Sequence, residues 1–452
     1  MDKISNHDAI RRWAEEAKSV SHISAVVCDL NGVLRGKKAP IKDIEKIIRG
    51  SFKLPLSTLL LDIWGRDVMQ SGQVLETGDV DGVLAPTSRG IIPVSWGVSP
   101  TALFPLSMNR FNGEPYEGDA RQVLASIVQQ YKSRDMTPVC AMELEFYLYK
   151  PADAGKGLSA PGGGRAVAAA SLYDLNELEH VSPIIEETYA VCARLGIPVG
   201  ATISEGGAGQ FEINLVHQSD ALRAADDALL LKQIVKGVAK KHGLAATFMA
   251  TPFGDDAGNG LHLHVSILNG AGENVFDNGK PEGSKQLRHA IGGLLEALPT
   301  SMLVFAPHAN SYRRLREGTH APTKCNWGYD NRTAAIRVPS GSNTSRRIEH
   351  RVAGADANPY LVMAVILGAM LNGLEEKTPL GAPAHGNAYE SGSANLPNSW
   401  QDAISAFATS SMMRKIFNDL LVDAFTACKR QELETLAAIV PPAEIEAYLE
   451  TV

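Results

Sequence analysis

Four short segments of the chain alternate apolar and polar residues with the period of two that is typical of half-buried β-strands. These segments are 142–148, 210–215, 260–266 and 347–351. In the first, Glu143 and Glu145 share one face, and the apolar residues share the other. Two carboxylates about 7 Å apart on one face repel each other unless a partner such as a divalent cation neutralises them. An ordinary solvent-facing strand explains this segment alone equally well.

The other three segments place further chemically active side chains on one face. These side chains are Gln210, Glu212 and Asn214; His262, His264 and Ser266; and Arg347, Glu349 and Arg351. Glu205 lies just upstream of the second segment, in a glycine-rich run. A lone histidine in a strand is more often a satisfied core residue than a ligand. Four such strands side by side, however, form a wall whose charges are too costly to leave unpaired.

The residue types on this wall favour a particular chemistry. Carboxylates with an imidazole suit Mg²⁺ or Mn²⁺ better than zinc. Arginines opposite them suit phosphate or carboxylate groups. The pattern therefore predicts metal-assisted phosphoryl transfer from a nucleotide, held without a Walker A loop because the chain contains none.

Hydrophobic periodicity and turn residues predict two domains of different character. Asn31-Gly32 between apolar runs predicts a β-hairpin, and strands are expected at 59–63 and 82–94, which together predict a small β-rich domain over residues 1–113. A linker is expected at 112–115, followed by an α+β domain over residues 114–452 with a flexible insertion at 151–170. Helices are expected at 8–19, 119–132, 183–195, 220–242, 285–302, 358–375 and 400–429.

Composition excludes several classes of protein. The 452 residues are 44% hydrophobic and 21% charged, with a net charge of -7, which argues against disorder and against a nucleic-acid partner. Five scattered cysteines without a C-x-x-C pair predict reduced thiols in a cytoplasmic protein. The first twenty residues lack the apolar core of a signal peptide. No stretch approaches about 18 uninterrupted apolar residues, so no membrane contact is expected.

At the level of motifs, the chain resembles the glutamine synthetase family over most of its length. The matching segments are 142–146, 205–212, 260–264, 310–315, 330–339, 346–351 and 358–361. The resemblance implies an N-terminal β-grasp domain and a C-terminal catalytic domain, whose curved antiparallel sheet is flanked by helices. It also implies a homo-oligomer, a dodecamer of two hexameric rings with active sites between neighbouring subunits.

The resemblance also implies roles for individual residues, with L-glutamate and ATP as substrates and two or three Mg²⁺ or Mn²⁺ ions per site. The first metal site would comprise Glu145, Glu205 and Glu212, and the second would comprise Glu143, His262 and Glu349. The glutamate contacts would be Gly258, Arg314 and Arg351. The ATP contacts would be His264, Ser266, Arg332, Arg337 and Arg347. Arg332 would also stabilise the transferred phosphoryl group, and Asp62 would bind the amine across a subunit interface.

The implied reaction has two steps. The γ-carboxylate of glutamate attacks the γ-phosphorus of ATP to give γ-glutamyl phosphate, and an amine then displaces phosphate. Because an alkylammonium has a pKa of about 10, like lysine, a base must remove a proton.

One segment departs from the family pattern. Glutamine synthetases carry Pro-Gly-x-Glu-Ala-Pro in the flap that deprotonates ammonium, and this chain has Glu317-Gly318-Thr319-His320-Ala321-Pro322. His320 therefore replaces the flap glutamate. The family's Asn-Gly-Ser-Gly is here Ala257-Gly258-Asn259-Gly260, so an asparagine that helps to hold glutamate is also missing. Neutral His320 could accept the proton of the amine; the alternative is that it only caps a loop.

Further segments are similar to the γ-glutamylpolyamine (γ-glutamylputrescine) synthetase branch. They are 29–37, 54–57, 78–82, 321–324 and 327–332. We therefore expect ATP-dependent γ-glutamylation of a primary amine or polyamine, in amine catabolism. A glutamine synthetase that uses ammonia and a catalytically inactive binding or structural protein are the alternatives. Tyr389, near the position of an adenylylated tyrosine in some family members, is interpreted as an ordinary loop residue.

Overall fold

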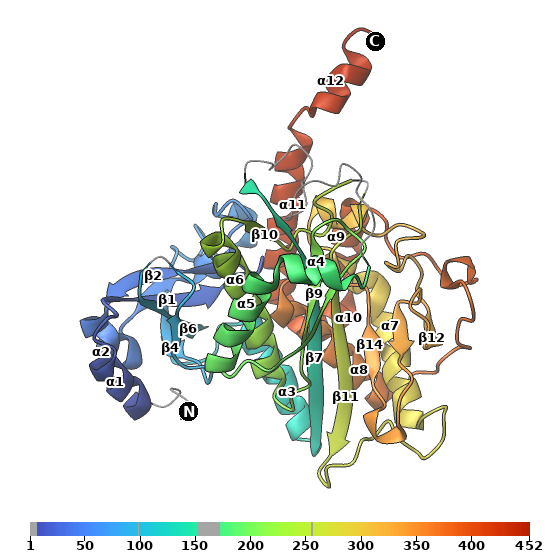
Figure 1. Ribbon diagram of the computed structural model, residues 1–452, viewed down its shortest axis with the longest axis horizontal. Coiled ribbons are helices and arrows are strands. Elements are labelled where there is room, and N and C mark those ends of the chain that lie inside the picture. Colours follow the sequence, from blue (N-terminus) through green and yellow to red (C-terminus); the bar gives the residue numbers. More distant parts are fainter. Residues whose placement is uncertain (1–6, 98, 152–171, 255) are drawn as a thin grey trace.

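Two β-sheets, one small and one large, organise the computed structural model of the chain (Figure 1). The structure describes residues 7–97, 99–151, 172–254 and 256–452. The predicted insertion at 151–170 therefore lies, apart from Pro151, outside the described residues. The boundary predicted between residues 113 and 114 stays a prediction, although the last strand of the small sheet ends at Asn109 and the next helix begins at Ala120.

The small sheet has six strands in the order β2-β1-β6-β4-β3, with β5 paired to β6. Its strands are β1 His22–Cys28, β2 Leu34–Pro40, β3 Lys53–Pro55, β4 Asp81–Pro86, β5 Ile92–Val94 and β6 Thr101–Asn109. The predicted hairpin is confirmed, because β1 and β2 pair antiparallel around Asn31 and Gly32. Gly32 has a φ of +76°, which glycine adopts at little cost. The sheet also contains a parallel pair, β1 with β6.

Two strand predictions in this region need correction. The segment 59–63 is not a strand: residues Leu56–Leu60 form a 3₁₀ helix, because Leu56, Leu59 and Leu60 all turn into the core. The segment 82–94 forms two strands, β4 and β5, which are separated by a turn that contains Gly90. The pattern also missed β6, the central strand of the sheet.

The large sheet has eight strands in the order β12-β13-β14-β11-β7-β9-β8, with β10 paired to β7. Its strands are β7 Met136–Tyr149, β8 Val199–Ser204, β9 Gln210–Leu215, β10 Ala245–Thr247, β11 Leu261–Asn269, β12 Trp327–Tyr329, β13 Ile336–Val338 and β14 Ile348–His350. The four strands predicted from alternation are thus neighbours, β14-β11-β7-β9. The pairs are antiparallel except for β12 with β13.

Helices flank this sheet, and the apolar faces of the strands are buried. Leu261, Leu263 and Val265 of β11, for example, are fully inaccessible to solvent. The helices are α1 His7–Glu16, α2 Ile44–Ile48, α3 Ala120–Lys132, α4 Leu175–His180, α5 Ser182–Arg194, α6 Ala221–Lys241, α7 Lys285–Phe305, α8 Pro359–Glu376, α9 Trp400–Thr409, α10 Ser411–Phe417, α11 Asp419–Ala437 and α12 Pro442–Tyr448. Short 3₁₀ helices are η1 Ile41–Asp43, η2 Leu56–Leu60, η3 Met69–Ser71, η5 Ala309–Arg313, η6 Asn343–Ser345 and η7 Ala388–Glu390. The α+β class is confirmed.

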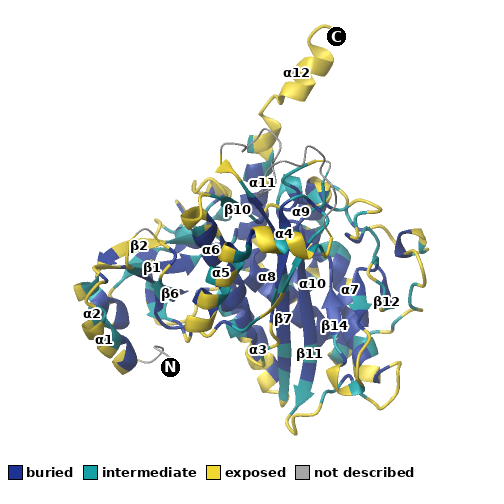
Figure 2. Ribbon diagram, in the orientation of Figure 1, coloured by how far each residue is buried: buried dark blue, intermediate teal, exposed yellow. Residues whose placement is uncertain are grey.

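The C-terminal region differs from the single helix predicted at 400–429. Ser410 and Asn418 each accept a hydrogen bond as an N-cap of the following helix, which divides the segment into α9, α10 and α11. Asn418 has a φ of +92°, which no helix interior accommodates. Beyond α11, the helix α12 projects from the body of the molecule and is exposed on all sides (Figure 2). No helix in the described residues is long and apolar enough to cross a membrane.

Candidate functional site

The polar faces of β14, β11, β7 and β9 meet on one side of the large sheet. In the register of these strands, Glu143 of β7 lies opposite both His262 of β11 and Asn214 of β9. Glu145 lies opposite Glu212, and His264 lies opposite Glu349. The predicted assembly of the four strands into one polar wall is therefore confirmed.

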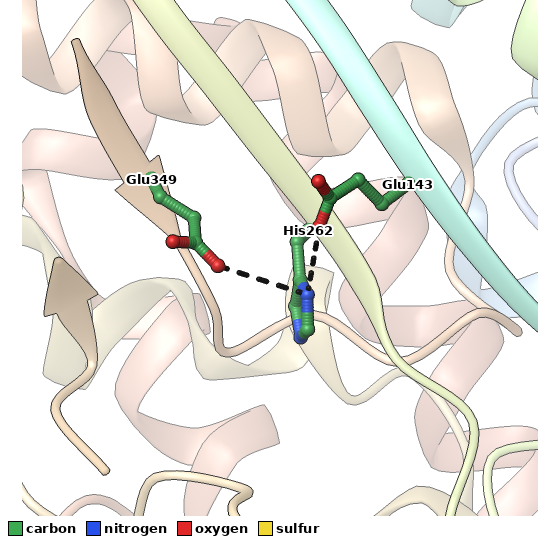
Figure 3. Close-up of side chains that lie close together, drawn as sticks. All are labelled: Glu143, His262 and Glu349. Atoms are coloured by element: carbon green, nitrogen blue, oxygen red, sulfur yellow. Dashed lines mark hydrogen bonds and ion pairs between the residues drawn. The ribbon is translucent and has the colours of Figure 1, made fainter. Parts of the chain in front are cut away.

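Glu143, His262 and Glu349 form the first compact group on this wall (Figure 3). Each offers a ligand atom within 4.8 Å of the others. The Nδ1 atom of His262 lies 3.3 Å from Oε2 of Glu143 and 3.9 Å from Oε1 of Glu349. This is the set of residues that the resemblance implies for the second metal site.

Glu145, Glu212 and His262 form the second group, again with ligand atoms within 4.8 Å of one another. His262 thus belongs to both groups, whereas the resemblance to the family implies it only for the second metal site. Glu205, the third residue expected at the first metal site, is not a member of either group. It lies near enough to Glu145 for their charges to interact, and its role as a ligand stays a prediction.

The carboxylates of this wall divide into two electrostatic classes. Burial and the negative charges of neighbours, Glu143 foremost, raise the pKa of Glu212 to about 10. Burial and Glu145 raise the pKa of Glu205 to about 8. Burial acts the same way on Glu349, but Arg351 and other cations outweigh it and lower its pKa to about 2.

Glu143 belongs with Glu349 in the second class. Burial acts to raise its pKa, but hydrogen bonds from His262 and His264 lower that pKa well below its usual range. The Nε2 atom of His264 lies 3.0 Å from Oε1 of Glu143. The wall thus brings several carboxylates close to an imidazole, and two of these carboxylates have raised pKa values. Such a set of ligands suits Mg²⁺ or Mn²⁺. The residues present therefore fit the expected divalent cations.

Arginines surround Glu349. Arg351 is buried and donates from its NH1 group to Oε1 of Glu349 and from Nε to the carbonyl oxygen of Arg332. Arg337 donates to Oε2 of Glu349 at 2.7 Å and also to Asp330. These guanidinium groups supply fixed positive charge beside the acidic wall, where an anionic substrate needs it.

Two further arginines lie at other points of the site. Arg314 is buried and donates from NH1 to the carbonyl oxygen of Val352 at 2.8 Å. Arg347 donates from Nε to Nδ1 of His264 at 3.0 Å. The latter contact fixes the His264 ring, whose other nitrogen faces Glu143.

Glycines at the start of β11 let backbone and side chains approach closely. The Gly260 amide donates to Oε2 of Glu145 at 2.7 Å. A Cβ atom on Gly260 would lie within 3.0 Å of Arg314, Glu145 and His262. A Cβ atom on Gly258 would lie 2.7 Å from Cγ of Arg314. Gly260 therefore lies where the predicted glutamate and metal residues converge, a role that its place at the head of the strand did not indicate.

The structure places the remaining predicted site residues as follows. Ser266 follows His264 on the same face of β11 and is half-buried. Arg332 is exposed on the turn before β13, near enough to Glu205 to lower its pKa. His320 is exposed, with a φ of +58°.

Asp62 lies apart from these residues, in the N-terminal domain. Its carboxylate accepts hydrogen bonds from the amides of Trp64 and Arg66 and from the side chains of Arg66 and Gln431. These partners all belong to the same chain and include none of the acidic wall. Its expected contact with an amine across a subunit interface stays a prediction.

His217 is a residue of the site that sequence reasoning missed. Its ring centroid lies 5.9 Å from that of His264. Burial and the neighbouring His264 and Arg347 lower its pKa to about 4, so the ring is neutral at physiological pH. Because His217 follows the end of β9, the alternation that marked the strands gave no signal for it.

A wall of carboxylates and imidazoles with arginines around it is the kind of enzyme site that suits divalent cations and anionic groups. Residues 117–448 match the glutamine synthetase catalytic domain, and the chain belongs to the glutamine synthetase family. It is 35% identical over 451 residues to γ-glutamylputrescine synthetase PuuA of Escherichia coli (strain K12), covering 97% of this chain and 94% of that protein.

Two other similarities agree with this assignment. The chain is 30% identical over 448 residues to glutamate–isopropylamine ligase of a Pseudomonas species, covering 97% of this chain and 96% of that protein. It also superposes on a solved structure described as the GmaS/ADP complex, conformation 1, with a TM-score of 0.85 and 27% identity, covering 99% of this chain and 100% of the other. The predicted family and fold are confirmed.

Proposed function

We propose that the chain is an ATP-dependent ligase that joins the γ-carboxylate of L-glutamate to a primary amine or polyamine. The observation that carries this proposal is the acidic wall with its arginines, in a chain whose flap has His320 instead of a glutamate. Relatives named as γ-glutamylputrescine synthetase and glutamate–isopropylamine ligase support an amine as the acceptor.

Glutamate would be held by arginines that are already buried and oriented. Arg314 and Arg351 would bind its α-carboxylate, and Gly258 leaves room beside Arg314. Mg²⁺ or Mn²⁺, two or three ions per site, would neutralise the charge that develops on the transferred phosphoryl group. The residues that would hold these ions are Glu143, Glu145, Glu205, Glu212, His262 and Glu349. ATP would contact His264, Ser266, Arg332, Arg337 and Arg347.

In the first step, an oxygen of the γ-carboxylate attacks the γ-phosphorus of ATP, and the bond from that phosphorus to ADP breaks. Arg332, on an exposed turn, would follow the phosphoryl group as it moves. In the second step, the neutral amine attacks the γ-carbon of γ-glutamyl phosphate, and phosphate leaves. His320 would take the proton that the nitrogen loses, which requires its neutral form.

An oligomer is part of the proposal, in which Asp62 of a neighbouring subunit would bind the amine. We propose a dodecamer of two hexameric rings. The C-terminal arm, residues 439–452, supports a close contact between copies. In this arm Ile439, Val440, Tyr448 and Leu449 are each more than half exposed, and a neighbouring copy would cover these apolar side chains. We also propose that the enzyme works in the cytoplasm, in polyamine or amine catabolism.

The decisive experiment measures phosphate release from ATP with glutamate and a panel of acceptors. The panel comprises ammonium, putrescine, spermidine, spermine, ethanolamine and simple alkylamines, each with Mg²⁺ or Mn²⁺. Turnover on alkylamines or polyamines far above that on ammonium is expected. Turnover on low millimolar ammonium alone would assign a glutamine synthetase instead. No ATP consumption with any acceptor would assign a binding or structural protein.

His320→Ala tests the proposed base. The variant is expected to lose about a hundredfold or more in amine turnover, the range of general-base contributions, and to change the pH profile of that turnover. Unchanged turnover with an unchanged pH profile would leave His320 as a loop residue only.

A further inference from the structure

Tyr389 contacts the flap that carries His320. It belongs to η7 and is 8% exposed. Its hydroxyl donates a hydrogen bond of 3.0 Å to the carbonyl oxygen of Ala321, the residue after His320. Burial raises the pKa of the phenol, whereas the positive charges of Arg351 and Arg314 lower it. The hydroxyl is therefore close to the two arginines proposed to bind glutamate.

The flap, residues 317–322, has a backbone that needs external support. Gly318 has a φ of +80° and His320 a φ of +58°, and the left-handed region is unfavourable for histidine. On the N-terminal side, the Thr319 hydroxyl lies within hydrogen-bonding distance of the carbonyl oxygens of Arg314 and Arg316, at 3.1 and 2.7 Å. On the C-terminal side, Tyr389 holds Ala321. His320 therefore lies between two side-chain braces.

The segment that contains Tyr389 also forms hydrogen bonds with the turn that contains Arg332. The amide of Ala388 donates to Oγ1 of Thr333 at 3.0 Å. The side chain of Asn331 donates from Nδ2 to the carbonyl oxygen of Gly386, also at 3.0 Å. Thr333 and Asn331 are the two neighbours of Arg332 in the chain. One short segment, residues 386–389, thus contacts both the flap and the Arg332 turn.

We infer that Tyr389 is a positioning residue, whose hydroxyl fixes the flap relative to the Arg332 turn and keeps water from the acyl phosphate. This inference rests on the proposed function. When the flap is loose, the oxygen of water attacks the γ-carbon of γ-glutamyl phosphate, and the bond from that carbon to the phosphate oxygen breaks. Glutamate and hydrogen phosphate are released; of the two protons of the water, one stays on the phosphate and the other passes to the buffer, and ATP is spent without an amide.

Tyr389→Phe tests this role, because it removes the hydroxyl and keeps the ring. The assay compares the phosphate released with the γ-glutamyl amide formed, using glutamate and the best amine of the panel. Phosphate formed in excess of amide is expected to rise about fivefold over wild type, which is the change in an equilibrium ratio that one net hydrogen bond supplies. The KM for the amine should rise while the KM for ATP stays constant.

Tyr131→Phe is the matched control. The hydroxyl of Tyr131 likewise donates to a carbonyl oxygen, that of Leu367, at 2.8 Å, and the residue is fully buried in the helical core. This variant should lose stability without excess phosphate. If Tyr389→Phe does not fold, Thr319→Ala removes the other brace and should give the same excess.

The outcomes separate the inference from the function on which it rests. Wild-type protein that consumes no ATP with any amine would refute the proposed function. Active wild-type protein, with the same ratio of phosphate to amide in the Tyr389 and Tyr131 variants, would refute only the positioning role.

Discussion

Gly260→Ala places one methyl group at the point where three functional side chains meet. The added Cβ would lie 2.9 Å from a terminal nitrogen of Arg314, 3.0 Å from Oε1 of Glu145 and 3.0 Å from Nε2 of His262. These atoms are the ends of side chains, not backbone. They can move apart by several tenths of an ångström to restore ordinary contact, and the fold itself can remain.

The expected effect therefore falls on activity more than on stability. Overpacking costs about 1–3 kcal/mol in a well-packed core, and the lower end applies here because side-chain ends can yield. A displacement approaching 1 Å in a catalytic group costs about a hundredfold in rate. Since two predicted metal ligands and one glutamate contact move together by several tenths of an ångström, kcat/KM for glutamate should fall by at least about tenfold and by up to about a hundredfold.

Two other glycine variants provide the comparison. Gly381→Ala meets nothing within 4 Å and should leave both activity and melting temperature unchanged. Gly258→Ala places its Cβ 2.8 Å from the carbonyl oxygen of Ala250, which is backbone and cannot yield cheaply. It should lose stability as well as activity. Amine-dependent phosphate release and thermal melting of the three variants test this order.

The reasoning fails if Gly260→Ala keeps kcat/KM for glutamate within about threefold of wild type, because a decrease of at least about tenfold is expected. Such a result would mean that Arg314, Glu145 and His262 do not together contact substrate or cation. Equal decreases in melting temperature for Gly260→Ala and Gly258→Ala would instead show that the side chains around Gly260 cannot move to make room for the methyl group.

Three further predictions concern charge, orientation and assembly. Because its pKa is about 10, Glu212 retains a proton at pH 7, and binding of a divalent cation should displace that proton. Calorimetry of cation binding in buffers of different ionisation enthalpy should show that Glu212→Gln releases about one proton fewer than wild type. Arg351→Lys cannot donate at once to Glu349 and to the carbonyl of Arg332, so its KM for glutamate should rise at least about tenfold, measured by initial rates. Deletion of residues 439–452 removes the exposed apolar arm and should reduce the sedimentation coefficient, whereas an unchanged value would show that the arm is not an oligomer contact.

Much of the catalytic sheet could be predicted because alternation of residue types marks each strand directly. The strands that contain Glu143, Glu212, His262 and Glu349 are neighbours in the structure, as their matching polar faces required. Short irregular elements could not be predicted in this way. A strand is predicted at residues 59–63, yet Leu59 and Leu60 belong to the 3₁₀ helix Leu56–Leu60, which buries Leu56, Leu59 and Leu60.

The site shows the same division between local pattern and tertiary contact. The metal-type residues lie on strands, where period two determines the direction of a side chain. Gly260, His217 and Tyr389 instead act through neighbours that are distant in sequence. A hydrogen bond from Tyr389 to Ala321 spans 68 residues, and no spacing in the chain indicates it.

The two electrostatic classes of carboxylate determine how much negative charge the wall carries at neutral pH. Glu349 and Glu143 have cationic or imidazole partners, so they remain ionised at neutral pH. Glu212 has no ion-pair partner among the described residues, and its raised pKa lets it stay neutral until a cation arrives. The negative charge of the wall is thereby reduced at Glu212, which the neighbouring carboxylates repel. Proton release on cation binding should therefore come from the Glu212 side of the wall, and a Glu349 variant should lose cation affinity without losing that release.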